Sequence, residues 1–226
     1  MLPHVSDVVL PPPPASADTQ DVPGVWRCPK CKLRLLAKTI GADGVTVRVY
    51  DEDDLTVDPL LASGITDSNG DYDVSFTWDG SCFLCESDPD IYVEWESENT
   101  KVEVEEATTF ETNYRWESGT TSNFSGTDLD KGTSTPADES LHPALHILTD
   151  LTRNWRWYLN NEGYDLSQVD AQWPEPDCAG AWYDPGPNEM HICTDREWRE
   201  DTHAHQYGHH WMNIEAASNG SDYCNG

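Results

Sequence analysis

Residues 194–212 read Thr-Asp-Arg-Glu-Trp-Arg-Glu-Asp-Thr-His-Ala-His-Gln-Tyr-Gly-His-His-Trp-Met. This stretch predicts a helix, because Thr194 and Glu197 have the spacing of a capping box, in which each side chain bonds the other residue's backbone N–H. His205 and His209 stand four positions apart, so both imidazoles project from one helix face, where they can bind one metal ion. We expect the inward stripe of this helix to consist of Trp198, Thr202, His205, His209 and Met212.

The segment His205-Gln-Tyr-Gly-His-His-Trp-Met212 is one substitution away from His-Glu-Tyr-Gly-His-His-x-Met. It resembles the HExxH active-site helix of zincin metallopeptidases, and the match extends over residues 140–215. The resemblance implies a Zn²⁺ cofactor bound by His205 and His209 and a peptide or protein substrate. Residues 189–193 resemble the edge strand that these enzymes place beside the substrate, and the helix from Ser140 resembles their backing helix.

Gln206 occupies the position of the general-base Glu in that motif. In the HExxH mechanism the Glu takes a proton from zinc-bound water and delivers it to the leaving amine, which an amide cannot do. The resemblance therefore implies a zinc metallopeptidase that is catalytically silenced in this chain. An engineered inactive form, a natural pseudoenzyme and an unrelated metal site are the three explanations that the sequence leaves open.

A catalytic zinc ion has three protein ligands, and the sequence leaves the third one open. Glu215 follows His209 by six residues, where metzincins carry their third ligand, although they turn the chain at a Gly where this chain has Met212. Asp222 is the other acidic candidate, and the remaining alternatives are another His or a group outside this chain.

The other histidines near these positions are assigned lesser roles. His203 and His210 lie on a different helix face, and we expect them at the surface or behind the ligands. Asp201 is a candidate for orienting a ligand imidazole. His142 and His146 also stand four positions apart and form a rival metal pair without the flanking motif.

The N-terminal half shows a different periodicity. Apolar and polar residues alternate, as expected of half-buried strands. The Asn69-Gly70 dipeptide predicts a hairpin turn, because both residues tolerate positive φ. The predicted strands cover residues 45–50, 72–78, 91–95 and 101–105. Several short strands with one polar face predict an antiparallel β-sandwich.

Three segments of this half, residues 47–53, 64–72 and 88–93, resemble the transthyretin-like and carboxypeptidase-regulatory family of small β-sandwiches. Such domains are accessory or binding modules, so the resemblance implies no chemistry by itself.

The predicted fold class is α+β with two domains. A Pro-rich tail or linker (1–25) precedes the transthyretin-like sandwich (26–116). A linker rich in Ser, Thr, Gly and Asp (117–139) leads to the zincin-like α+β core (140–226), which has the appearance of a C-terminally truncated domain.

The first helix of this core is capped by Ser140, carries Pro143 in its first turn and stops at Gly163. Strands follow at residues 181–183 and 189–192, with a turn at 184–187 between them.

Charge and composition exclude several classes of protein. Carboxylates outnumber Lys and Arg by 42 to 13, which gives a formal net charge of −29. Phosphate-backbone binding needs clustered Lys and Arg, so we expect no nucleic-acid partner. No run of about 18 apolar residues occurs, so we expect no membrane span. The 10 Trp, 9 Tyr and 4 Phe argue against a disordered chain.

The seven cysteines favour an exported protein. Two C-x-x-C pairs fit either two disulfides or one structural four-cysteine zinc site. These pairs are Cys28 with Cys31 and Cys82 with Cys85. Cys178 and Cys193 can pair with each other, which leaves Cys224 alone. The alternative to a secreted metallopeptidase is a non-catalytic acidic extracellular binding module whose histidines are incidental.

Overall fold

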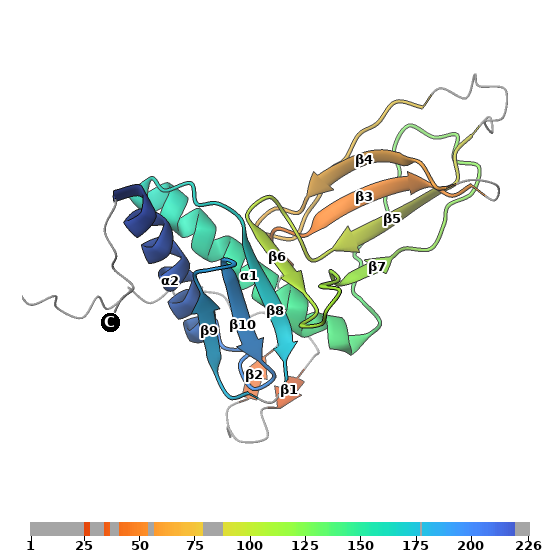
Figure 1. Ribbon diagram of the computed structural model, residues 1–226. Helices are drawn as coiled ribbons and strands as arrows, with labels where there is room; N and C mark the ends of the chain where they lie inside the picture. Colours follow the sequence, from red (N-terminus) through yellow and green to blue (C-terminus); the bar gives the residue numbers. More distant parts are fainter. Residues whose placement is uncertain are drawn as a thin grey trace, which may run out of the picture. The chain divides into compact units, whose positions relative to one another are not determined.

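The computed structural model describes residues 25–27, 34–36, 41–53, 57–78, 88–176 and 178–219 (Figure 1). The chain divides into two compact units, residues 1–39 and residues 40–226. In the first unit, β1 (Val25–Arg27) pairs antiparallel with β2 (Arg34–Leu36). The predicted sites at Cys28, Cys31, Cys82, Cys85 and Asp222 lie outside the described residues.

The second unit contains an antiparallel sheet in the order β4-β3-β5-β7. Its strands are β3 (Thr46–Asp51), β4 (Leu60–Ile65), β5 (Ile91–Glu96) and β7 (Arg115–Glu117). The strands predicted at 45–50 and 91–95 are thereby confirmed to within a residue. The alternation of apolar and polar residues made these strands predictable, because it places apolar side chains on one buried face. These side chains are Val47, Val49, Val93 and Trp95.

The turn at Asn69-Gly70 forms as predicted, but the strand predicted after it does not. The Asp67 carboxylate accepts hydrogen bonds from the backbone N–H groups of Asn69 and Asp71, and Gly70 has φ of 81°. Residues 71–78 are described without strand pairing, although Tyr72, Val74 and Phe76 pack against the core. The alternating pattern therefore marks side-chain packing at these residues and not a hydrogen-bonded ladder.

A second sheet, in the order β6-β8-β10-β9, packs against the two long helices (Figure 1). It consists of β6 (Val102–Glu105), β8 (Val169–Glu175), β9 (Ala181–Asp184) and β10 (Glu189–Cys193). β6, β8 and β10 run parallel, whereas β9 pairs antiparallel with β10 and forms the edge opposite β6.

The strands predicted at 181–183 and 189–192 are confirmed, and β8 was not predicted. Residues 189–193, which resemble an edge strand in sequence, form the inner strand β10, so β9 is the edge.

The pairing of β6 with β8 connects the two halves of the chain. Residues 101–105 were expected in the N-terminal sandwich, but in the structure Val102–Glu105 pair with Val169–Gln172. Fully buried Asp43, just before β3, also accepts hydrogen bonds from Arg156 on the first helix. The protein is α+β as predicted, and the division into a separate sandwich and core stays a prediction.

Two helices form in the regions predicted to be helical, but the start of the second one differs. α1 (His142–Trp157) continues through a π-helical turn (Tyr158–Glu162) and stops at Gly163, whose φ of 76° is left-handed. A short 3₁₀ turn precedes α1, and its cap is Asp138, which accepts from the N–H of Ser140, so Ser140 is not the cap itself.

α2 (Glu200–Asn219) begins six residues later than the capping box predicts. The N–H groups of Arg196 and Arg199 bond the carbonyls of Cys193 and Arg196, so successive tight turns occupy residues 194–198. The predicted Cys178–Cys193 disulfide is present and joins the end of β10 to the segment before β9.

The two faces of the parallel sheet differ in polarity. The row Val104, Ala171 and Met190 is fully buried on the face that α1 and α2 cover. The adjacent row, Glu103, Asp170 and Glu189, points to the opposite face because side chains alternate along each strand. No helix among the described residues is long and apolar enough to cross a membrane.

Candidate functional site

Helix α2 brings His205 and His209 together on one side. Their Nε2 atoms lie 3.1 Å apart and their ring centroids 4.7 Å apart. A tetrahedral zinc ion with Zn–N bonds of about 2.05 Å holds two nitrogens about 3.3 Å apart. His205 is exposed and His209 is partly buried, so both nitrogens face a region that an ion can reach. The pair thus has the spacing that chelation of one zinc ion requires.

The electrostatic environment of His209 favours its neutral form. Burial lowers the pKa of His209 below its usual value, and the neighbouring His205 lowers it further. A neutral imidazole has a free nitrogen lone pair, which a metal ion needs, so this shift reduces competition from protons.

Gln206 lies between α2 and the edge strand β9. Its Nε2 donates a hydrogen bond of 3.1 Å to the carbonyl of Ala181, and its side chain is buried. Its Oε1 is buried without a hydrogen-bond partner among the described residues. The Ala181 carbonyl requires a donor, which an amide supplies and an ionised carboxylate does not.

The third ligand predicted for this pair is not brought into place by α2. The helix runs unbroken to Asn219, so Glu215 lies six residues beyond His209, about 9 Å along the axis. The turn that would return Glu215 to the pair is absent, because Met212 is helical. The described residues therefore supply two ligands at this position.

The surface position predicted as one alternative for His203 and His210 is wrong, because both side chains are fully buried. His203 Nδ1 lies 2.8 Å from Asp150 Oδ2, and its Nε2 lies 3.1 Å from the carbonyl of Arg196.

His210 Nδ1 lies 2.8 Å from Asn188 Oδ1, and its Nε2 lies 3.2 Å from the carbonyl of Ser167. Burial lowers the pKa of His210 to about 4, against a smaller opposing effect of the Ser167 carbonyl. His210 is therefore a neutral, hydrogen-bonded part of the core at neutral pH.

The inward stripe predicted for α2 is also wrong. Trp198, which precedes the helix, is 49% exposed and Met212 is 38% exposed. The buried face consists of His203, Gln206, Tyr207 and His210. These residues follow the i, i+3, i+4, i+7 spacing of one helix face, which was the available signal. This buried face was not predicted, because polar side chains are buried only where other residues hydrogen-bond them. Those hydrogen-bonding residues are distant in sequence.

The remaining candidates have other partners. His142 Nε2 contacts the carbonyl of Pro136, whereas His146 Nδ1 lies 3.4 Å from Asp150, so the rival pair separates. Asp201 forms an exposed ion pair with Arg199 at 3.2 Å, and this pairing lowers the pKa of its carboxyl.

Fold and site together define an α+β protein in which a helix with two solvent-facing histidines packs beside the antiparallel edge of a mostly parallel sheet. No protein-family model and no curated protein matches the chain. Among solved structures, the chain is similar to a 9R-lipoxygenase from Cyanothece PCC8801, with 16% identity and a TM-score of 0.27. That alignment covers 54% of this chain and 22% of the lipoxygenase, so the chain spans less than a quarter of that protein.

Proposed function

We propose that this chain is a zinc-binding protein of the metallopeptidase type, with His205 and His209 as zinc ligands and Gln206 in place of the general base. The observation that carries the proposal is the 3.1 Å separation of the two Nε2 atoms on one face of α2. The ion would supply a Lewis acid that polarises a peptide carbonyl and acidifies a bound water.

The sheet supports a peptide substrate. β9 is the edge strand, and within the described residues its pairing is with β10 on one side. An extended peptide can add to such an edge through backbone hydrogen bonds. The Gln206 side chain contacts β9 at Ala181, so the residue in the base position lies where the helix meets this strand.

The histidine pair leaves room for further ligands. Catalytic zinc sites have three protein ligands, so we propose that Asp222 or a group outside this chain joins the pair. Glu215 can be the third ligand only if metal binding ends α2 before this residue. Gln206 cannot accept the proton of a zinc-bound water, so the proposal includes weak or absent hydrolysis by this chain.

Two broader assignments belong to the same proposal. The Cys178–Cys193 disulfide supports export, because disulfides persist in oxidising compartments. The antiparallel sheet β4-β3-β5-β7, with its turn at Asp67–Gly70, would serve as the transthyretin-like accessory module.

The first test measures zinc bound per chain after metal removal and reloading. We expect His205→Ala/His209→Ala to bind one zinc less than the unmodified chain, with X-ray absorption showing two imidazoles on the lost ion. His142→Ala, on α1, is the matched control and should lose none. Equal zinc content in the double variant and the unmodified chain would refute the proposal.

The second test separates metal binding from chemistry. Gln206→Glu should gain chelator-sensitive cleavage of an unfolded protein such as casein, whereas Gln206→Ala, which lacks both amide and carboxylate, should not. Circular dichroism checks that each variant is folded. If zinc-loaded, folded Gln206→Glu cleaves no faster than Gln206→Ala, the zinc site stands and the peptidase assignment fails.

A further inference from the structure

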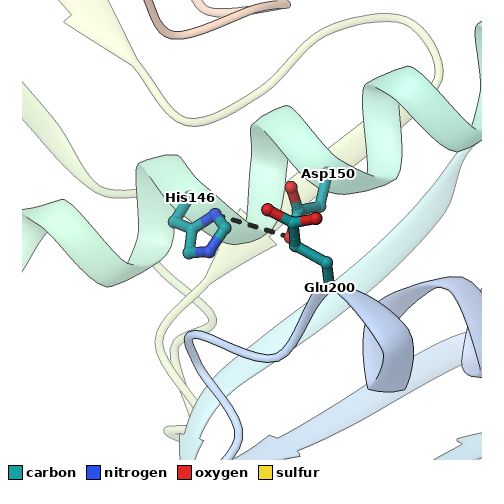
Figure 2. Close-up of side chains that lie close together, drawn as sticks. All are labelled: His146, Asp150 and Glu200. Carbon is teal, nitrogen blue, oxygen red and sulfur yellow. Dashed lines mark ion pairs between the residues drawn. The ribbon is translucent and has the colours of Figure 1, made fainter. Parts of the chain in front are cut away.

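We propose a second divalent-metal site between the two helices, formed by His146, Asp150 and Glu200. One ligand atom from each of these side chains lies within 4.8 Å of the others. Figure 2 shows the carboxylates of Asp150 and Glu200 facing each other beside the His146 ring. Within the part of the chain that the structure describes, this is the one group of three such side chains.

The backbone places the three groups without distortion. His146 and Asp150 are four residues apart on α1, so both project from one face, with His146 Nδ1 3.4 Å from Asp150 Oδ2. Glu200 is the first residue of α2 and approaches from the other side. An ion about 2.0–2.2 Å from each ligand atom holds those atoms about 3–4 Å apart, so binding requires only small side-chain movements.

The charge of the cluster favours a cation. Asp150 is 5% exposed and Glu200 is exposed, so a buried and a solvated carboxylate face each other in a chain of net charge −29. A divalent ion offsets both carboxylates. The imidazole points to a transition metal such as Zn²⁺, because Ca²⁺ and Mg²⁺ take oxygen ligands.

Surrounding residues hold two of the ligands in position. The buried His203 contacts Asp150 Oδ2 at 2.8 Å, which fixes the orientation of the carboxylate beside His146. The ring of Trp198 lies against His146 with centroids 5.0 Å apart. Such supporting contacts are typical of residues that orient metal ligands.

This site is distinct from the histidine pair of the proposed function. Glu200 precedes His205 by five residues, about 7.5 Å along the axis of α2 and more than a third of a turn around it. A different explanation for Glu200 is that an acidic residue in a first turn stabilises the helix dipole. Asp201 would serve that role equally, so comparing these neighbours separates the two explanations.

The test uses the His205→Ala/His209→Ala chain, which lacks the other site. After removal of metal, calorimetric titration with ZnCl₂ should show one saturable zinc per chain. Adding Glu200→Gln should weaken this binding at least about tenfold, since even the loss of an orienting residue costs 10–100-fold. Adding Asp201→Asn, which removes the same charge one residue on, should leave the affinity unchanged.

Glu200 is exposed, so its substitution should not unfold the protein, and circular dichroism checks this. Absence of saturable binding in the double variant, or equal affinities of the Glu200→Gln and Asp201→Asn chains, overturns this site. Failure of the double variant to lose zinc would instead refute the proposed function and leave this site intact.

Discussion

Helix α2 carries two pairs of histidines that have opposite surroundings. His205 and His209 face outward, and each Nε2 has the other as its neighbour at 3.1 Å. His203 and His210 are fully buried, and all four of their ring nitrogens lie within 3.2 Å of an oxygen. One helix therefore has a structural pair and a pair available to a ligand.

The comparison shows that spacing alone does not assign a role to a histidine. The hydrogen-bonding groups of the buried rings contact α1, the turns before α2 and the loops before β8 and β10, so these rings hold several elements together. The outward rings are close enough to repel each other when protonated, and a metal ion would relieve that contact. Each prediction below tests this division.

The largest expected effect comes from the buried pair. His203→Ala removes the nearer of the two imidazoles beside buried Asp150 and leaves His146 at 3.4 Å. It should lower the free energy of unfolding by about 3 kcal/mol, because the buried carboxylate loses most of its compensation. Urea unfolding measures this loss. His205→Ala, two residues away on the exposed side, should change stability by less than about 0.5 kcal/mol. Equal losses in the two variants would contradict the division of roles.

The outward pair should affect stability only through metal. In a Glu200→Gln chain, which lacks the second site, zinc at about 100 times its dissociation constant should raise the free energy of unfolding by about 2.7 kcal/mol. The further change His205→Ala/His209→Ala should abolish this rise and leave metal-free stability unaltered. Thermal unfolding with and without zinc measures both quantities. A zinc-induced rise that survives the double substitution would show that the ion binds elsewhere.

The third effect concerns pH. Unfolded His210 takes up a proton near its ordinary pKa of about 6.5, whereas burial delays uptake in the folded state to about 4. The unfolded state binds more protons between these values, so stability falls as pH falls through this window. pH 5 lies about 1.5 pH units below the pKa of unfolded His210. At about 1.36 kcal/mol per pH unit, His210 therefore lowers the free energy of unfolding by about 2 kcal/mol at this pH.

Carboxylates on the other face of the sheet act in the opposite direction. Burial, followed by the charge of Glu103, raises the pKa of Glu105 to about 7 and that of Asp170 to about 6. Their contribution to stability is present at low pH and is lost as pH rises through those values. His210→Gln isolates the histidine, because both chains share the carboxylates. The stability difference between them should shift by about 2 kcal/mol between pH 8 and pH 5, and a constant difference would contradict the argument.

Local patterns predicted much of this fold, and long-range contacts account for most of the errors. β3, β5 and α1 were predicted because the spacing of apolar residues within each element indicates one buried face. β8 was missed although Val169, Ala171 and Trp173 alternate, because Pro174 interrupts the pattern. The partnership of β6 with β8 joins residues more than 60 positions apart, and no local signal specifies it.

The candidate site shows the same limit. Placement of His205 and His209 one turn apart followed from their spacing, whereas the burial of His203 and His210 depends on Asp150, Asn188 and the Ser167 carbonyl. The second metal cluster was missed because Glu200 and Asp150 are brought together only by the packing of α1 against α2. The sequence does show one part of this cluster, because His146 is followed four positions later by Asp150, the spacing of one helix face.

The smallest expected effect lies on the buried face itself. Tyr207 is fully buried between His210 and Tyr158, with ring centroids 5.3 and 5.8 Å away, yet its hydroxyl has no hydrogen-bond partner among the described residues. Burial raises the pKa of Tyr207, so the hydroxyl stays neutral. Tyr207→Phe removes an unsatisfied group without loss of packing and should leave stability unchanged or raise it by up to about 1 kcal/mol. Urea unfolding that shows a loss above about 1 kcal/mol would mean that this hydroxyl, like the neighbouring imidazoles, is hydrogen-bonded in solution.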